Sequence, residues 1–220
     1  MSSLPTTAPT PARLLQLLSE PRLSTYVDAC GGNLDAVLRL YAWNAAVSAA
    51  FWQPLGHVEV ALRNAMSDAL SKRPGRGGVR GSWLDDPDRV LDGRARADIA
   101  TARRRVRRKR KQPSDAQTIS ELGFGFWRYL ITRRHTALWP DLASAFPGAP
   151  DRRRETVEEP VARLHELRNR IAHHERIWSS DLPARYTDVL LVAGYLDAGL
   201  PEWIARGCRV PVLLRARPRG

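Results

Sequence analysis

The sequence predicts an all-α protein, built as a helical bundle with short peripheral helices. Apolar residues recur at three- and four-residue spacing along most of the chain, whereas the alternation typical of half-buried strands is scarce. Of the 220 residues, 43% are hydrophobic and seven are Trp, which is enough for one substantial core. We therefore expect a single helical domain over residues 12–206, between a disordered lead-in (1–11) and a basic tail (207–220).

The first predicted helices have recognisable start and stop signals. Short amphipathic helices are expected at residues 12–20 and 24–30. Asn33 is the expected N-cap of a long helix, because its side chain can accept a hydrogen bond from the first turn. Pro54 and Gly56 should divide or kink that helix, since proline lacks the N–H that the helix interior needs.

A Gly- and Arg-rich stretch at residues 73–82 predicts a loop before a basic helical insertion near residues 87–111. Asp85 or Asp86 is the expected N-cap of this helix, with Pro87 in its first turn. The insertion matches no family motif that we recognise, so it is interpreted as this protein's own feature.

Three further helical segments are expected in the second half of the chain. One spans about residues 126–138, and another follows Asp151 and must accommodate Pro160 by a kink or by a fresh start. A last long helix should begin after Ser180 or Asp181. The aromatic residues of the first segment are predicted to fill the core: Phe126, Trp127 and Tyr129.

Composition restricts the class of protein and of partner. A formal net charge of +12 and a pI near 10.8 exceed what solubility requires, and they favour a polyanionic partner. No stretch reaches the ~18 uninterrupted apolar residues of a membrane span, and the N-terminus lacks the pattern of a signal peptide. We expect a cytoplasmic protein with no membrane contact, in which Cys30 and Cys208 are ordinary buried thiols.

The end of the predicted insertion is basic at every position from 103 to 111 except Val106. Such a run is either a solvated helix face or a contact to nucleic acid, because phosphates relieve its internal repulsion and release counterions. No aromatic residue interleaves it, so base stacking is not indicated there. The candidate nucleic-acid-binding residues are Arg103, Arg104, Arg105, Arg107, Arg108, Lys109, Arg110 and Lys111.

Residues 164–178, LHELRNRIAHHERIW, carry unusual polar chemistry for a helix. Arg168 falls on the apolar stripe formed by Val157, Val161, Leu164 and Ile171, so it needs either a carboxylate partner or an anion. Glu59 and Arg63, four residues apart, are either an ordinary helix ion pair or charge partners for Arg168, in which case the Glu59 carboxylate would neutralise the Arg168 guanidinium. A neighbouring polar stripe steps by four residues and comprises His165, Asn169 and His173.

This combination of side chains suits metal-independent cleavage of RNA. Imidazole can take a proton from a ribose 2′-hydroxyl or give one to a leaving 5′-oxygen, and guanidinium can stabilise the charge on the scissile phosphate. No metal or other cofactor is expected. Arg168 and His173 lie about 140° apart on an ideal helix, so the helix must end or bend there, or a second subunit must bring the two groups together.

The run LRNRIAHHERIW resembles the signature of the Abi-like (abortive infection) family of the HEPN superfamily, and LYAWNAAVSAAFWQPLGHVEVALRNAM resembles that family's N-terminal segment. The likeness extends from about Leu17 to Leu196. It implies a HEPN-type bundle that forms a homodimer with a composite ribonuclease site. On this resemblance the catalytic residues are Arg168, Asn169 and His173, and the auxiliary residues are His174, Arg176, Glu59 and Arg63.

The resulting hypothesis is a metal-independent endoribonuclease of an abortive-infection (anti-phage) or toxin-type system. Its RNA target would be tRNA or mRNA, its products would end in 2′,3′-cyclic phosphate, and an antitoxin or other regulatory protein could restrain it. The alternative is a non-catalytic RNA-binding or regulatory protein that keeps the polar helix for folding or dimerisation.

Overall fold

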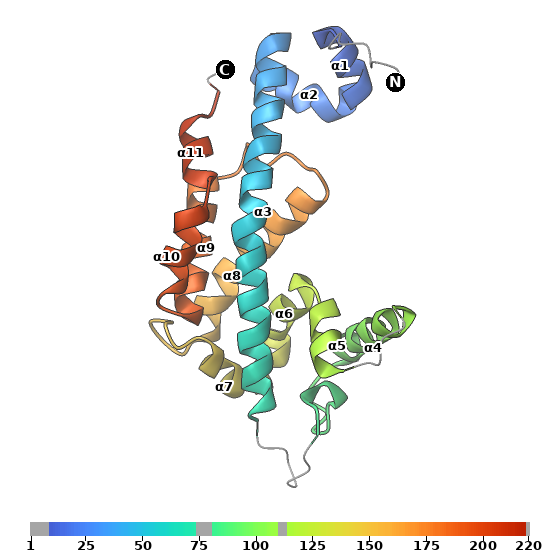
Figure 1. Cartoon of the computed structure of the whole chain (residues 1–220), viewed down its shortest axis with the longest axis vertical. Helices are drawn as coiled ribbons and strands as arrows, with labels where there is room; N and C mark the ends of the chain where they lie inside the picture. Colours follow the sequence, from blue (N-terminus) through green and yellow to red (C-terminus); the bar gives the residue numbers. More distant parts are fainter. Residues whose placement is uncertain (1–8, 74–80, 110–113, 219–220) are drawn as a thin grey trace, which may run out of the picture.

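The computed structural model describes residues 9–73, 81–109 and 114–218, and within these ranges the chain forms α-helices and short 3₁₀ helices without any strand. The prediction of an all-α bundle is therefore confirmed (Figure 1). The helices are α1 (Pro11–Leu18), α2 (Glu20–Ala29), α3 (Leu34–Ser71), α4 (Gly93–Arg108), α5 (Asp115–Glu121), α6 (Phe124–Leu130), α7 (Trp139–Leu142), α8 (Arg154–Ala172), α9 (Leu182–Leu196), α10 (Leu200–Gly207) and α11 (Val210–Arg215).

Helix α3 is the axis of the molecule and runs without a break for 38 residues. Asn33 caps it as predicted, since its Oδ1 accepts a hydrogen bond of 3.0 Å from the Ala36 N–H. The expected division at Pro54 and Gly56 is wrong. Pro54 itself is buried, and the fully buried Phe51 and Val58 hold the helix against the core on either side of it. This packing offsets the one backbone hydrogen bond that proline removes.

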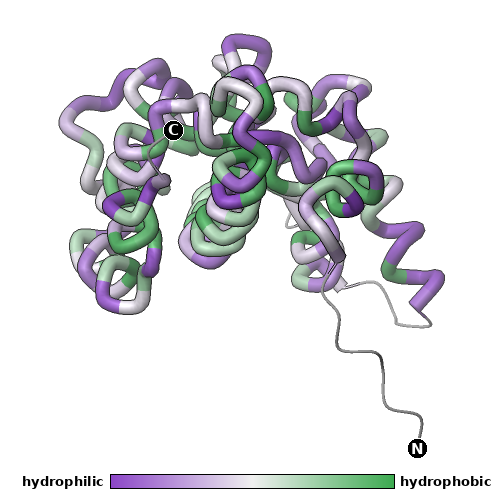
Figure 2. The backbone as a smooth tube through the Cα atoms, turned by 90° about the horizontal axis from the view of Figure 1, so that it is seen from above, coloured by the Kyte–Doolittle hydropathy of each residue, from purple (hydrophilic) through white to green (hydrophobic). Residues whose placement is uncertain are grey.

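The other helices pack around α3 in two groups. Helices α8 and α9 form the largest contact in the molecule and both rest on α3, with α10 and α11 beside α9. Helices α4 and α5 pack together on the opposite side of α3, and α6 links them to α8 (Figure 1). Hydrophobic and hydrophilic segments are interspersed along the helices, as expected of amphipathic helices (Figure 2). The expected core aromatic residues Phe126, Trp127 and Tyr129 are buried.

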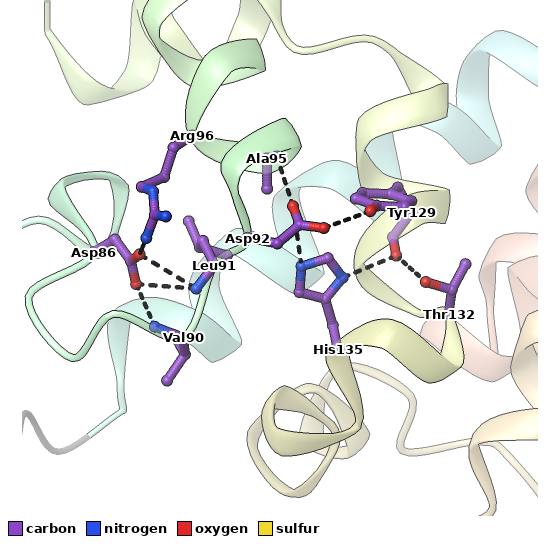
Figure 3. Close-up of polar contacts among 9 residues, drawn as sticks. All are labelled: Asp86, Val90, Leu91, Asp92, Ala95, Arg96, Tyr129, Thr132 and His135. Carbon is purple, nitrogen blue, oxygen red and sulfur yellow. Dashed lines mark hydrogen bonds and ion pairs between the residues drawn. The ribbon is translucent and has the colours of Figure 1, made fainter.

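Helix α4 begins later than the sequence predicts, because Asp92 is its N-cap in place of Asp85 or Asp86. Asp86 instead adopts a left-handed conformation (φ 48°) at the end of a 3₁₀ turn, and its carboxylate accepts hydrogen bonds from the Val90 and Leu91 N–H groups (Figure 3). These bonds hold the chain in a loop up to Asp92. Residues 74–80 of the expected loop, with Arg110 and Lys111 of the expected helix, lie outside the described residues.

Asp92, the N-cap of α4, also connects this helix to α6 through a hydrogen bond. The Asp92 carboxylate accepts 2.9 Å and 2.5 Å hydrogen bonds from the Ala95 N–H and the Tyr129 hydroxyl (Figure 3). Buried His135 lies behind it, with its Nε2 3.8 Å from Asp92 Oδ1 and its Nδ1 3.3 Å from the Tyr129 carbonyl oxygen. The start of the basic helix is therefore anchored to the core by a polar network.

Element boundaries elsewhere differ from the prediction in a consistent way. The helix expected at 126–138 is α6 followed by a 3₁₀ helix, Arg133–Leu138. Helix α8 starts after Arg153 and contains buried Pro160 without interruption, so Asp151 does not cap it. Asp181 caps α9 as one of the two expected residues. In α8, burial of the apolar face therefore outweighs the local effect of the proline.

The expected basic tail contains a packed helix. Val210 of α11 is fully buried, and the Trp43 indole N–H donates a 2.7 Å hydrogen bond to the Leu213 carbonyl oxygen. The lead-in also becomes helical at Pro11, where Thr10 is the N-cap of α1; residues 1–8 lie outside the described part.

No helix in the described part of the chain has the length and apolar character to cross a membrane. Cys30 and Cys208 are free thiols and are half-buried, which differs from the expected full burial.

Candidate functional site

The polar stretch of the sequence lies where α8 ends and the chain turns back across α3. His173 is the C-cap of α8, and its N–H donates to the Asn169 carbonyl oxygen at 3.0 Å. His174 adopts a left-handed conformation (φ 54°), which ends the helix. Buried Asn44 of α3 then accepts hydrogen bonds from the Ile177 and Trp178 N–H groups at 2.9 Å and 3.0 Å. Asn44 therefore fixes the turn on α3.

A hollow of about 330 Å³ lies between this turn and α2. We refer to it as the cationic hollow. Three arginines, two histidines and one carboxylate are among the side chains that line it: Arg22, Arg170, Arg176, His173, His174 and Glu175. Such a surplus of positive charge is suited to an anion such as phosphate. The structure thus brings the predicted residues His173, His174 and Arg176 together.

Two of the arginines already support the backbone of the turn. The Arg22 guanidinium donates a hydrogen bond to the His174 carbonyl oxygen. The Arg170 guanidinium donates to the Arg176 carbonyl oxygen and, at 2.6 Å, to the Ser180 hydroxyl. In contrast, the exposed side chains of His173, His174 and Arg176 make no hydrogen bond or ion pair within the described ranges. They are the groups available to a ligand.

Arg168 lies outside this hollow. Its Nε is 3.7 Å from Glu59 Oε2, and its guanidinium lies 5.5 Å from the centre of the Trp52 ring. The expected pairing of Arg168 with Glu59 is therefore present. Glu59 has a second task, because its Oε1 accepts a 2.9 Å hydrogen bond from the Phe124 N–H at the start of α6. The auxiliary residue Arg63 takes no part and hydrogen-bonds its neighbour Asn64.

Asn169 faces a third group of residues. Its amide lies 3.2 Å from Nε2 of His165, whose ring packs edge-on against Phe124. Burial lowers the pKa of His165 below its usual 6.5, and the nearby guanidinium groups of Arg128, Arg168 and Arg94 lower it further. Neutral His165 can therefore accept a hydrogen bond from Asn169.

Gly125 of α6 makes room for this histidine. A Cβ at position 125 would lie 3.1 Å from His165 Nε2, closer than most real contacts. The absence of a side chain there lets the imidazole lie directly against the α6 backbone.

Within one chain, the three predicted catalytic residues thus lie on three surfaces. Arg168 faces Glu59 and Trp52, Asn169 faces His165, and His173 lines the cationic hollow. This agrees with the angular separation expected on the helix, since the structure ends α8 at His173 without turning it toward Arg168.

The basic face of α4 forms a second candidate surface. Ala95, Ile99, Ala102 and Val106 form the buried stripe, so the arginines between them face outward. Arg103 is paired with Asp85 at 2.6 Å, and Lys109 is paired with Glu121. Within the predicted basic run, the arginines that are exposed and have no ion pair in the described structure are Arg104, Arg105, Arg107 and Arg108.

Sequence reasoning missed Arg22, Arg170 and Asn44. Arg170 was inside the quoted stretch, and its helical position beside His173 and His174 was the available signal. Arg22 gave no signal, because it contacts the site across 152 residues of sequence.

Among the residues that the structure describes, no three His, Cys, Asp or Glu side chains lie close enough to hold a metal ion. Comparison with protein-family models, with curated proteins and with solved structures found no match for this chain.

Proposed function

We propose that this protein is a metal-independent endoribonuclease. The observation that carries the proposal is the cationic hollow, where the side chains of His173, His174 and Arg176 are exposed and make no hydrogen bond or ion pair with the part of the chain that the structure describes. Arg and His side chains around a hollow large enough for a phosphate are the groups needed to bind a phosphodiester and to move protons at its oxygens.

In the proposed reaction the ribose 2′-oxygen attacks the adjacent phosphorus and the 5′-oxygen leaves. His173 takes the proton of the 2′-hydroxyl or donates a proton to the leaving oxygen. Arg176 holds the phosphate and stabilises its added charge. The products carry 2′,3′-cyclic phosphate and 5′-hydroxyl ends.

Arg168 and Asn169 enter the proposed site through a homodimer. Because Arg168 is separated from His173 within one chain, its role as a phosphate clamp requires a second copy that brings its own α8 to the hollow. An Abi-like, HEPN-type dimer has this arrangement, and the polar end of α8 supports the resemblance.

The cellular role proposed with this activity is defence against phage by abortive infection, or a toxin held inactive by an antitoxin or other regulatory protein. The substrate is tRNA or mRNA in the cytoplasm. The net charge of +12 and the exposed arginines of α4 support an RNA partner.

The test compares wild type, His173→Ala and a matched control, His57→Ala, on total bacterial RNA in EDTA. His57 lies on α3 against Trp203, apart from the hollow. We expect His173→Ala to slow cleavage by about 10²–10⁴-fold, the usual contribution of general acid–base catalysis, and His57→Ala to cleave normally. Undiminished cleavage by His173→Ala, or products with 5′-phosphate ends, would refute the proposal.

A specific observation favours a second candidate, a non-catalytic RNA-binding protein. Arg168 is already neutralised by Glu59, and Arg22 and Arg170 are bound to backbone carbonyls, so these groups have structural roles. Salt-sensitive RNA binding by wild type with no cleavage would favour this candidate.

A further inference from the structure

A second cavity adjoins the cationic hollow. It has a volume of about 460 Å³ and runs along α3 beside the end of α8, and we refer to it as the α3 groove. Its walls are mainly apolar and comprise Tyr41, Ala45, Ala49, Trp52, Ile171 and Ala172. This volume is within the range of small-molecule sites in proteins.

The groove contains aromatic side chains on which a flat heterocycle can stack and a hydroxyl group with which it can form a hydrogen bond. Tyr41 lies at one end and Trp52, 49% exposed, lies at the other, about 16 Å away at 1.5 Å per residue. Aromatic rings of this kind stack with nucleobases of any sequence. Between them the Ser48 hydroxyl is shielded from solvent and has no hydrogen-bond partner in the described part of the chain. An unpaired polar atom at this position is costly unless a ligand supplies the partner.

The groove and the hollow are adjacent. Arg22, His174 and Glu175 line both cavities, so one ligand can occupy both. The hollow has an excess of positive charge and the groove is apolar. This pairing matches the phosphate and the base of one nucleotide.

We propose that the α3 groove receives one unpaired base of a single-stranded RNA whose adjacent phosphate lies in the cationic hollow. The inference rests on the proposed RNA substrate, but it does not require that the RNA is cleaved. A duplex does not fit, because its bases are stacked and paired and cannot enter a groove between two helices. The protein therefore selects unpaired loops or single strands.

The experiment uses three probes of equal length: an unstructured 12-nucleotide strand of 2′-fluoro RNA, the same strand annealed to its complement, and an abasic strand with the same phosphates. The 2′-fluoro group removes the nucleophile, so binding is measured without cleavage. Ala49→Leu fills the groove, and Ala46→Leu is the matched control, since Ala46 is also an exposed alanine of α3 but does not line the groove. Thermal unfolding checks that both variants fold.

We expect wild type to bind the single strand about tenfold more tightly than the duplex or the abasic strand, a difference of ~1.4 kcal/mol and within the range for stacking of one base. Ala49→Leu should lose this advantage and bind the abasic strand normally, whereas Ala46→Leu should match wild type.

Three results would overturn the inference: unchanged single-strand binding by Ala49→Leu, equal weakening of the abasic strand, or a change of sedimentation from dimer to monomer in Ala49→Leu with RNA binding intact. The last result would place a second copy of the chain in the groove.

Cleavage of unmodified RNA is assayed separately. Base-dependent binding without cleavage refutes the nuclease and leaves the groove assignment standing, and cleavage without base dependence refutes only the groove.

Discussion

At the scale of single residues, Glu59 shows how one carboxylate connects three helices. It lies on α3, pairs with Arg168 of α8 and accepts the Phe124 N–H at the start of α6, where Gly123 supplies no side-chain cap. The ion pair is partly exposed, so its own contribution to stability is small. The hydrogen bond that Glu59 accepts from the partly buried Phe124 N–H contributes more to stability. Without an acceptor, this N–H would keep the full free-energy cost of its removal from water.

Two substitutions of Glu59 separate these contributions. Glu59→Gln keeps an acceptor for the Phe124 N–H and removes the charge, and we expect it to lower the free energy of unfolding by less than about 1 kcal/mol. Glu59→Ala removes both and should cost about 1–3 kcal/mol. Denaturant unfolding of the two variants measures the difference. Equal losses would show that the ion pair is the dominant interaction.

His165 makes the stability of the fold depend on pH. Its pKa is lowered in the folded protein by burial and by Arg128, Arg168 and Arg94. Below pH 6.5 the unfolded chain therefore binds a proton at His165 more readily than the folded chain does, and stability falls as the pH falls through this region. We expect His165→Gln to flatten the slope of unfolding free energy against pH between pH 7 and pH 5. A slope equal to that of wild type would contradict this assignment.

At the scale of elements, α4 is an amphipathic helix with a narrow apolar stripe and a broad cationic face. Its buried residues pack on α5. The hydrogen bond from the Tyr129 hydroxyl to the Asp92 carboxylate anchors the start of the helix. The arginines on its outer face are thus held on a rigid support. A rigid cationic face binds phosphates with little loss of conformational entropy.

The contribution of α4 to RNA binding can be measured by charge removal. Replacing Arg104, Arg105, Arg107 and Arg108 with Gln should weaken binding of single-stranded RNA and reduce the slope of log K against log salt by about 0.7 for each lost phosphate contact. The matched control removes the same charge from four other exposed arginines: Arg13, Arg39, Arg206 and Arg215. If the control variant loses as much RNA affinity as the α4 variant, the net charge of the protein, and not the arginines of α4, attracts the RNA.

At the scale of the whole molecule, the end of the chain closes the bundle. Helix α11 packs on α3 and α9, and Arg217 lies 5.5 Å from the centre of the Trp43 ring that also hydrogen-bonds the Leu213 carbonyl. Because α3 also carries Asn44 and the α3 groove, α11 supports the helix on which the candidate site is built.

Truncation tests this support. Deletion of residues 208–220 exposes the surface that covers Val210, and burial of such a side chain alone contributes about 1.5–3 kcal/mol. We expect the truncated protein to unfold at a clearly lower temperature. Deletion of residues 218–220 retains α11 and Arg217 and is the control, which should unfold close to wild type. Equal unfolding temperatures for both truncations would show that α11 behaves as a tail.

Features that depend on neighbouring residues were predictable from the amino-acid sequence. Helical period, the N-caps Asn33 and Asp181 and the aromatic core could be predicted, because capping and amphipathicity act within one or two turns. The pairing of Arg168 with Glu59 was one of the arrangements that the sequence allowed, since a guanidinium on an apolar stripe needs a carboxylate or an anion.

The remaining features depend on long-range packing and became visible in the folded structure. Pro54 and Pro160 remain inside continuous helices because core packing outweighs one lost hydrogen bond, and Arg22 joins the cationic hollow from a distant helix. The separation of Arg168 from His173 depends on where α8 ends. The left-handed conformation of His174 and the hydrogen bond that Asn44 Oδ1 accepts from the Ile177 N–H fix this end. These outcomes arise from contacts between residues far apart in the chain, whose energies no local pattern records.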